Sequence, residues 1–276
     1  MSTAVTTRVE PDLDEAVEGA KRRALAVGLT ATAVVGVLVA VLLLVTVGAV
    51  LAAIGTVVVL LAGAVGWSLW VGSGFANAES EVCSRLGVEV GPDELPTLHN
   101  ALEGVAILTG VQVPRVRLID DDAANAMVAC GEGTSTVVVT SGLLRGAGAV
   151  EAEALAASLL CRVRDGSARC ATLAAGLPGP LVAAAGLGPE ELATSLGEQR
   201  AVRADAEAVS VTRYPPGLIA ALERMSRQGT RPTDVPVSTA ALWIAPAAGA
   251  PEGVDESIDR TVNQPIEYRV AVLSEL

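Results

Sequence analysis

The stretch that decides the fold is residues 24–78, ALAVGLTATAVVGVLVAVLLLVTVGAVLAAIGTVVVLLAGAVGWSLWVGSGFANA, which contains no charged residue and no proline. One helix needs about 20 apolar residues to cross a bilayer, so this stretch is long enough to cross it twice. We expect two transmembrane helices, at about residues 24–45 and 50–71, with a tight turn near Gly48. The alternatives are one long tilted helix and a signal peptide, but the stretch is too long for the latter.

The basic residues beside the first helix predict how this hairpin is oriented. Lys21, Arg22 and Arg23 directly precede it, and basic residues next to a span stay in the cytoplasm. Two crossings then return the chain to the cytoplasmic side. Trp67 and Trp70 fall near the end of the second helix, where indole rings favour the headgroup level. The sequence therefore predicts a multi-pass protein of the cell inner (cytoplasmic) membrane whose soluble domain faces the cytoplasm.

The overall charge argues against nucleic-acid binding. The 276 residues carry a formal net charge of −12, with a pI of about 4.6, and an acidic chain is repelled by a phosphate backbone. We therefore expect the membrane lipid bilayer, and no nucleic acid, among the partners. The cysteines form no CxxC pair and are expected to be reduced packing residues; they are Cys83, Cys130, Cys161 and Cys170.

Beyond the hairpin, the pattern of apolar residues predicts a mixed α/β domain. Helices are expected at about residues 92–110, 150–164, 189–212, 215–228 and 265–276. Short β-branched runs predict a small sheet with strands at 116–119, 126–130 and 136–140. Gly131-Glu132-Gly133 predicts that the last two strands form a hairpin. The expected division of the chain is a cytosolic N-terminal tail at 1–23, a transmembrane hairpin at 24–72 and a cytosolic domain at 79–276.

The domain contains a series of short motifs in a definite order. They are Glu94-Leu95-Pro96-Thr97-Leu98-His99-Asn100, Val113-Pro114-Arg115-Val116-Arg117-Leu118-Ile119, Asn125-Ala126-Met127-Val128, Val138-Val139-Thr140-Ser141-Gly142-Leu143-Leu144, Arg203-Ala204-Asp205-Ala206-Glu207-Ala208 and Asn263-Gln264-Pro265-Ile266-Glu267-Tyr268-Arg269. With the hairpin, this order resembles that of the HtpX-like membrane zinc metallopeptidases, of the HExxH gluzincin type. The resemblance covers nearly the whole chain after Lys21. It implies an α+β fold in which the hairpin precedes a mainly helical metallopeptidase-like domain with a small β-sheet. It also implies that Asn125, Ala126, Met127 and Val128 form the edge strand of a substrate groove.

The resemblance further implies where a zinc site would lie, and this sequence departs from the family pattern there. In the family a helix carries HExxH, whose two histidines bind zinc while the glutamate polarises the bound water. Ser158 and Arg162 stand at the histidine positions, and Leu159 stands at the glutamate position. The third ligand, a glutamate in the family, falls on Ala201, four residues before Asp205.

The histidine count excludes an HExxH motif at any other position in the chain. His99 is the single histidine of the chain, and it lies far from this motif, whereas HExxH needs two. We therefore expect no cofactor, and we interpret the chain as a pseudoprotease that acts as a binding or regulatory protein. Its expected partners are membrane proteins or an active protease paralogue. The alternative is a metalloendopeptidase of protein quality control that uses a noncanonical ligand set.

Other candidate chemistry is less well supported. Cys161 beside Arg162 could be an activated thiolate, and Ser158 with Asp205 could form a hydrolase pair, but neither has a histidine as a base. Asp120-Asp121-Asp122 could hold a divalent cation, although adjacent carboxylates in a turn more often form a solvated loop.

The sharpest expectation concerns what replaces the metal. In the family, the aspartate corresponding to Asp205 orients a zinc-bound histidine, and a carboxylate buried without that partner would be costly. Arg162 lies one helical turn from Ser158 on the same face. We expect the Arg162 guanidinium to replace the charge of the metal and to bind Asp205. The alternative is that Arg162 extends to the surface while Asp205 pairs locally with Arg200 or Arg203.

Overall fold

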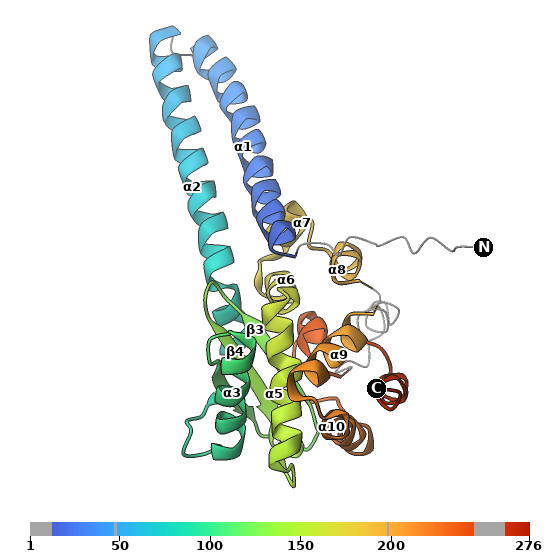
Figure 1. Cartoon of the computed structure of the whole chain (residues 1–276). Helices are drawn as coiled ribbons and strands as arrows, with labels where there is room; N and C mark the ends of the chain where they lie inside the picture. The colour runs from blue at the N-terminus through green and yellow to red at the C-terminus, as the bar shows by residue number, and fades with distance from the viewer. Residues whose placement is uncertain (1–12, 47–48, 198, 246–262) are drawn as a thin grey trace, which may run out of the picture.

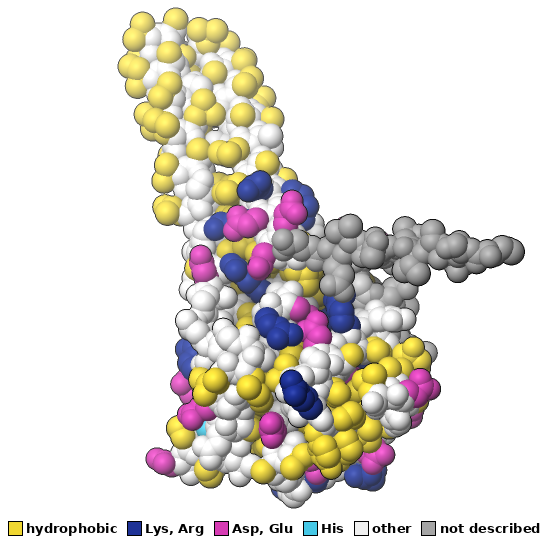
Figure 2. Space-filling view, viewed as in Figure 1, with side chains coloured by type: hydrophobic (Ala, Val, Ile, Leu, Met, Phe, Trp, Pro, Cys, Tyr) yellow, Lys and Arg dark blue, Asp and Glu magenta, His cyan; other side chains and the backbone are white. Residues whose placement is uncertain are grey.

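The computed structural model describes residues 13–46, 49–197, 199–245 and 263–276. Two long helices, α1 (Leu13–Thr46) and α2 (Ala49–Ser84), project side by side from a mainly helical body (Figure 1). Both are long and apolar enough to cross a bilayer, with mean hydropathies of 2.6 and 2.4 in their most apolar windows. Apolar side chains cover the outer part of this hairpin, and charged side chains begin where it joins the body (Figure 2). The expected pair of membrane helices is therefore confirmed.

The first helix begins earlier than a separate N-terminal tail would allow. Leu13, Val17, Ala20 and Ala24 are all buried, and their spacing of three or four residues puts them on one helix face. They pack with leucines of α6 (Ser167–Gly176) and α7 (Gly179–Ala185). Residues 13–23 are thus part of α1 and of the folded body, because this apolar face needs a partner.

The sheet has four strands in the order β1-β2-β4-β3. Its strands are β1 (Val88–Glu89), β2 (Arg115–Ile119), β3 (Ala126–Cys130) and β4 (Ser135–Thr140). Strands β2 and β4 are parallel, whereas β1 runs antiparallel to β2 and β3 runs antiparallel to β4. The predicted hairpin is confirmed, since Cys130 pairs with Ser135 and the Gly131 amide donates to the Thr134 carbonyl at 2.9 Å. This order leaves β3 at one edge of the sheet.

Helix α5 (Ala149–Arg164) runs through the middle of the body, next to α3 (Pro96–Thr109) and α9 (Arg200–Thr212) (Figure 1). The remaining helical elements are α4 (Ser141–Leu144), α8 (Pro189–Leu196), α10 (Pro215–Gln228), the 3-10 helix η1 (Val237–Leu242) and α12 (Ile266–Leu273). One predicted helix was wrong in extent. Residues 189–212 form two helices, because α8 ends at Gly197, whose φ of 80° lies outside the helical region.

A buried carboxylate joins the second membrane helix to the sheet. Glu79, in the last part of α2, is 4% exposed. It accepts hydrogen bonds from the hydroxyls of Thr134 and Thr136, the latter at 2.6 Å, and from Arg115 at 3.2 Å. Because these partners come from β2, β4 and the turn before β4, α2 is fixed to the sheet at the point where it leaves the apolar hairpin.

Candidate functional site

The face of α5 that would carry the metal ligands points into the interior. Ser158, Leu159 and Arg162 each have no exposed surface. Ser158 and Arg162 are four residues apart, so their side chains lie one above the other on the same helix face. Within the described part of the chain, the Ser158 hydroxyl and Arg162 Nε have no hydrogen-bond partner. This face is therefore polar at two points, although it is sealed from solvent.

Arg162 binds backbone carbonyls and not Asp205. Its Nη1 donates to the Trp243 carbonyl at 2.9 Å, and its Nη2 donates to the Ile244 carbonyl at 3.4 Å. The expected ion pair between Arg162 and Asp205 was therefore wrong. The alternative in which Arg162 extends to the surface was also wrong, because the side chain is fully buried.

Asp205 instead pairs with an arginine from the last helix. Arg269 donates from Nε to Oδ2 of Asp205 at 2.6 Å and from Nη2 to Oδ1 at 2.8 Å. Both side chains are at most 1% exposed. Two parallel bonds between a guanidinium and a carboxylate form the strongest ion-pair geometry available to side chains. Arg269 also donates to the Ile244 carbonyl at 2.6 Å, so it shares an acceptor with Arg162.

Three buried arginines therefore gather beside one buried aspartate. Arg200, at the start of α9, is 1% exposed and donates to the Ala241 carbonyl. Burial, together with the charges of Arg200 and Arg269, lowers the pKa of Arg162 to about 9, although Asp205 and Asp165 act to raise it. Burial likewise lowers the pKa of Arg200 to about 10. Both groups stay charged at neutral pH, and the half-buried Asp165 acts with Asp205 as a nearby counter-charge.

The predicted groove strand β3 lies at the sheet edge, as expected, but that edge is already paired. Met127 forms an antiparallel bridge with Trp243, and the Ile244 amide donates to the Ala126 carbonyl at 2.8 Å. Asn125 bonds Ala245 in both directions, from Nδ2 to the carbonyl at 3.0 Å and from the amide to Oδ1 at 3.3 Å. All of β3 is buried. A segment of the same chain thus covers the β3 edge of the sheet.

Curated relatives identify the family. A protease HtpX homolog from Dictyoglomus thermophilum is 30% identical over 205 residues, covering 62% of this chain and 67% of that protein. The chain belongs to the HtpX protease family. An HtpX homolog from Dictyoglomus turgidum is 31% identical over 55% of this chain and 61% of its own length, and one from Streptococcus agalactiae is 26% identical over 56% and 66%. Alignments with these two span a little under two thirds of the HtpX homologs. No family model and no solved structure matches.

The residues expected at the metal positions of the HtpX family do not fit zinc. Zinc is bound in proteins by thiolate, imidazole and carboxylate groups, whereas these positions hold the Ser158 hydroxyl, the Arg162 guanidinium and the Ala201 methyl group. The Arg162 cation would repel a dication. Asp205 is the buried carboxylate that comes closest to a metal ligand in chemistry, but both its oxygens accept hydrogen bonds from Arg269. Among the described residues, no three His, Cys, Asp or Glu side chains form a metal-binding group.

The structure also places the single histidine and the candidate thiol. His99 is buried on α3, with Nδ1 3.0 Å from the Leu95 carbonyl oxygen, which is a packing position. Cys161 is buried and free, and burial raises the pKa of its thiol to about 11. Arg164 lowers that pKa less than burial raises it, so Cys161 is not an activated thiolate. The other three cysteines are likewise buried and free, as expected.

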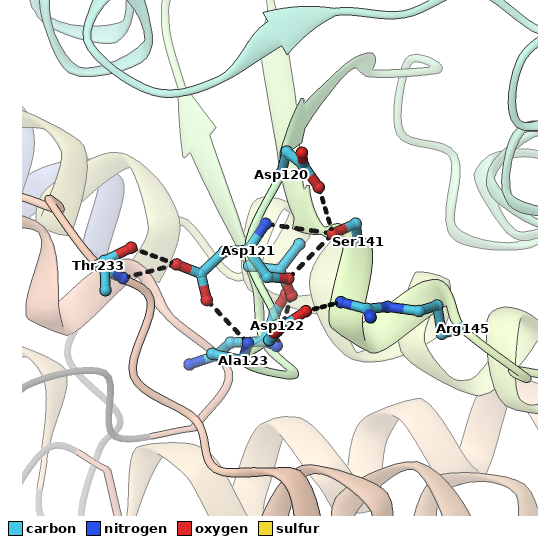
Figure 3. A network of polar contacts seen from close by, with 9 residues as sticks. Asp120, Asp121, Asp122, Ala123, Ser141, Arg145 and Thr233 are labelled. Carbon is cyan, nitrogen blue, oxygen red and sulfur yellow. Dashed lines mark hydrogen bonds and ion pairs between the residues drawn. The ribbon is translucent and has the colours of Figure 1, made fainter.

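The three adjacent aspartates turn to separate partners, as Figure 3 shows. Asp120 accepts from the Ser141 hydroxyl at 3.0 Å, and Asp122 pairs with Arg145. Asp121 accepts from the Ala123 amide at 2.8 Å and from the amide and hydroxyl of Thr233 at 2.8 and 2.6 Å. Because each carboxylate has its own partner, they form a loop-fixing network and do not converge on one point where a cation could sit.

Two parts of the site were missed by reasoning from the sequence. Arg269 shares the buried face of α12 with Ile266 and Leu273, and a charge at that spacing needs an internal partner. The residues Ala-Leu-Trp-Ile-Ala at 241–245 form an apolar run in a region for which no helix or strand was predicted. Such a run, followed directly by Pro246, is also typical of a short buried strand.

Proposed function

We propose that this chain is a membrane-anchored, catalytically inactive HtpX-like protein that acts by binding or regulation. The observation that carries this proposal is the buried Arg162 guanidinium at a metal-ligand position, hydrogen-bonded to the main chain at Trp243 and Ile244. An arginine does not lose its proton in a protein near neutral pH. It therefore cannot act as a zinc ligand, and its charge opposes binding of a cation nearby.

The other groups that peptide hydrolysis would need support the same proposal. A zinc peptidase attacks with a metal-bound water that a carboxylate helps to deprotonate. Leu159 stands where that carboxylate belongs and packs in the apolar core. Asp205 keeps its place but is neutralised by Arg269 at 2.6 Å. Neither residue is arranged to hold or move a proton from water.

A surface for a partner is available where the membrane helix meets the body. A hollow of about 520 Å³ lies at the foot of α2, lined on one side by Trp70, Asn77 and Glu81 and on the other by Leu177 and Pro178. A mixture of indole, amide and carboxylate groups suits a protein segment that enters from the bilayer. We therefore propose a membrane protein, or an active protease paralogue, as the partner that binds here.

The names of the relatives favour a second candidate. They are called protease HtpX homologs, so a membrane metalloendopeptidase of protein quality control, with a noncanonical site, is the competing proposal.

The basic residues beside the first membrane helix support a location and an orientation. We propose the inner membrane with the domain on the cytoplasmic side, because Lys21, Arg22 and Arg23 precede the apolar part of α1. A reporter enzyme fused after Leu276 should be active only in the cytoplasm, and activity only outside it would contradict the topology.

A cleavage assay with a built-in control tests the two functions. The full chain, purified in detergent, is incubated with unfolded casein and zinc, beside an active zinc protease of the HtpX type. We expect no cleavage by this chain. Cleavage that a chelator blocks, and that is absent from a mock preparation of cells lacking the chain, would establish the noncanonical protease. Equal cleavage by the mock preparation would be traced to a contaminating enzyme.

A further inference from the structure

The segment Ala241–Ala245 comprises the last two residues of η1 and the three residues after it, and Trp243 has an extended backbone, with φ −72° and ψ 149°. It lies against β3 like a short bound peptide. Its Ile244 amide donates to Ala126 of β3, and Met127 pairs with Trp243 in the antiparallel sense. Addition of an extended segment to an exposed sheet edge is a recurring mode of peptide recognition. Here the segment belongs to the same chain, so it is tethered and present at a very high effective concentration.

The carbonyls of this segment are held by the arginines around the former metal position. Arg200 binds the Ala241 carbonyl, Arg162 binds those of Trp243 and Ile244, and Arg269 binds that of Ile244. These bonds use charged donors in an interior without solvent, where a hydrogen bond is stronger than in water. The three guanidinium groups thus orient the backbone carbonyls of this segment.

The side chain of Trp243 anchors the segment. It has no exposed surface and lies in an apolar cluster with Val82, Leu86, Met127 and Val138. Its indole Nε1 donates to the Thr239 hydroxyl at 3.1 Å. A fully buried aromatic side chain whose N–H is satisfied is typical of the dominant contact in a peptide interface. The Asn125 side chain fixes the other end by its two bonds to Ala245.

We propose that Ala241–Ala245 is an internal peptide ligand that closes the β3 groove. An external ligand of this groove would be an extended apolar peptide with an aromatic residue, which must displace the segment to bind. This inference deepens the proposed function, on which it rests for the role in binding, and it takes from the resemblance to the HtpX family the expectation that β3 forms the edge of a groove. A partner that binds without displacing the segment must use another surface.

A substitution that weakens the pairing of the Ala241–Ala245 segment with β3 tests whether an external peptide can take its place. Ile244→Pro removes the amide that bonds Ala126, whereas Val237→Pro places the same residue outside the segment as a control. A labelled peptide, Ala-Ala-Leu-Trp-Ile-Ala with a solubilising tag, is titrated against each full-length protein by fluorescence anisotropy. We expect Ile244→Pro to bind it at least tenfold more tightly than wild type or Val237→Pro. Equal binding by wild type and Ile244→Pro, or no binding by either, would overturn the proposal.

Hydrogen exchange on the unmodified protein gives a measurement that needs no variant to fold. The amides of Ile244 and Ala245 should exchange at least 100-fold more slowly than in the free peptide, because both are hydrogen-bonded and buried. Exchange at the rate of the free peptide would overturn the closed groove. Neither readout involves zinc or cleavage. Proteolysis by the wild type would thus refute the inactive function, and fast exchange would refute the internal ligand.

Discussion

The molecule contains two ion pairs between an aspartate and an arginine, one buried and one exposed to solvent. Asp205 and Arg269 are 1% and 0% exposed, whereas Asp122 and Arg145 are 94% and 60% exposed. Water screens the outer pair and solvates each partner when the other is removed. The inner pair has no such substitute, since its surroundings are two other arginines and apolar side chains. The comparison teaches that the buried charges of Asp205 and Arg269 support the fold, and that the loop network of Figure 3 is local.

The largest effect is expected for Asp205→Asn. The change keeps the shape of the side chain but leaves Arg269 without a counter-charge next to Arg162. Removing one partner of a buried pair costs about 3–5 kcal/mol. We expect the thermal unfolding midpoint of the protein in detergent to fall accordingly. The double variant Asp205→Leu with Arg269→Met should recover at least part of the loss, and an unchanged midpoint in Asp205→Asn would contradict the buried pair.

A smaller loss is expected for Arg162→Met. The variant removes donors to Trp243 and Ile244, but the Ile244 carbonyl keeps its bond from Arg269. Loss of hydrogen bonds to a charged group costs about 1.5–3 kcal/mol, and relief of repulsion with Arg200 offsets part of it. The midpoint of Arg162→Met should therefore lie between those of wild type and Asp205→Asn. A fall as large as that of Asp205→Asn would show that Arg162 is paired more strongly than its contacts indicate.

As the pH falls, the hydrogen-bond network of Asp120, Asp121 and Asp122 should be lost before the rest of the domain unfolds. Burial acts to raise the pKa of Asp121, but hydrogen bonds from Thr233 and Ala123 outweigh it and lower that pKa below its ordinary value of 3.8. A lowered folded-state pKa means that the stabilisation is present above that ordinary value and is lost as the pH falls below it. Asp121→Asn should make stability less dependent on pH in that acidic range. A loss at neutral pH as large as that of Arg162→Met would contradict a local role.

The smallest effect is expected for Arg145→Ala. Its pair with Asp122 is exposed on both sides, so the change should leave the unfolding midpoint within error of wild type. Arg145→Ala is thus the matched control for the buried arginines. A clear fall in its midpoint would remove the contrast between the two pairs.

The fold was largely predictable, because its main signals are local. The uncharged run at 24–78 predicts the hairpin, and β-branched runs predict β3 and β4 nearly to the residue. The partner of Asp205 was not predictable in this way, since Arg269 lies 64 residues away and reaches it only when α12 packs on α9. The same holds for the 241–245 segment, whose pairing with β3 depends on tertiary contacts and not on its own sequence.

Zinc content of the purified protein tests the central claim most directly. The full chain is dialysed against zinc in detergent, desalted and measured by mass spectrometry of the metal. A variant carrying Ser158→His, Leu159→Glu, Arg162→His and Ala201→Glu serves as the positive control for the assigned positions. We predict less than about one zinc per ten wild-type molecules, because a buried arginine and no imidazole stand at the site. One zinc per molecule in the wild type, lost in Asp205→Asn but not in Arg145→Ala, would contradict the account.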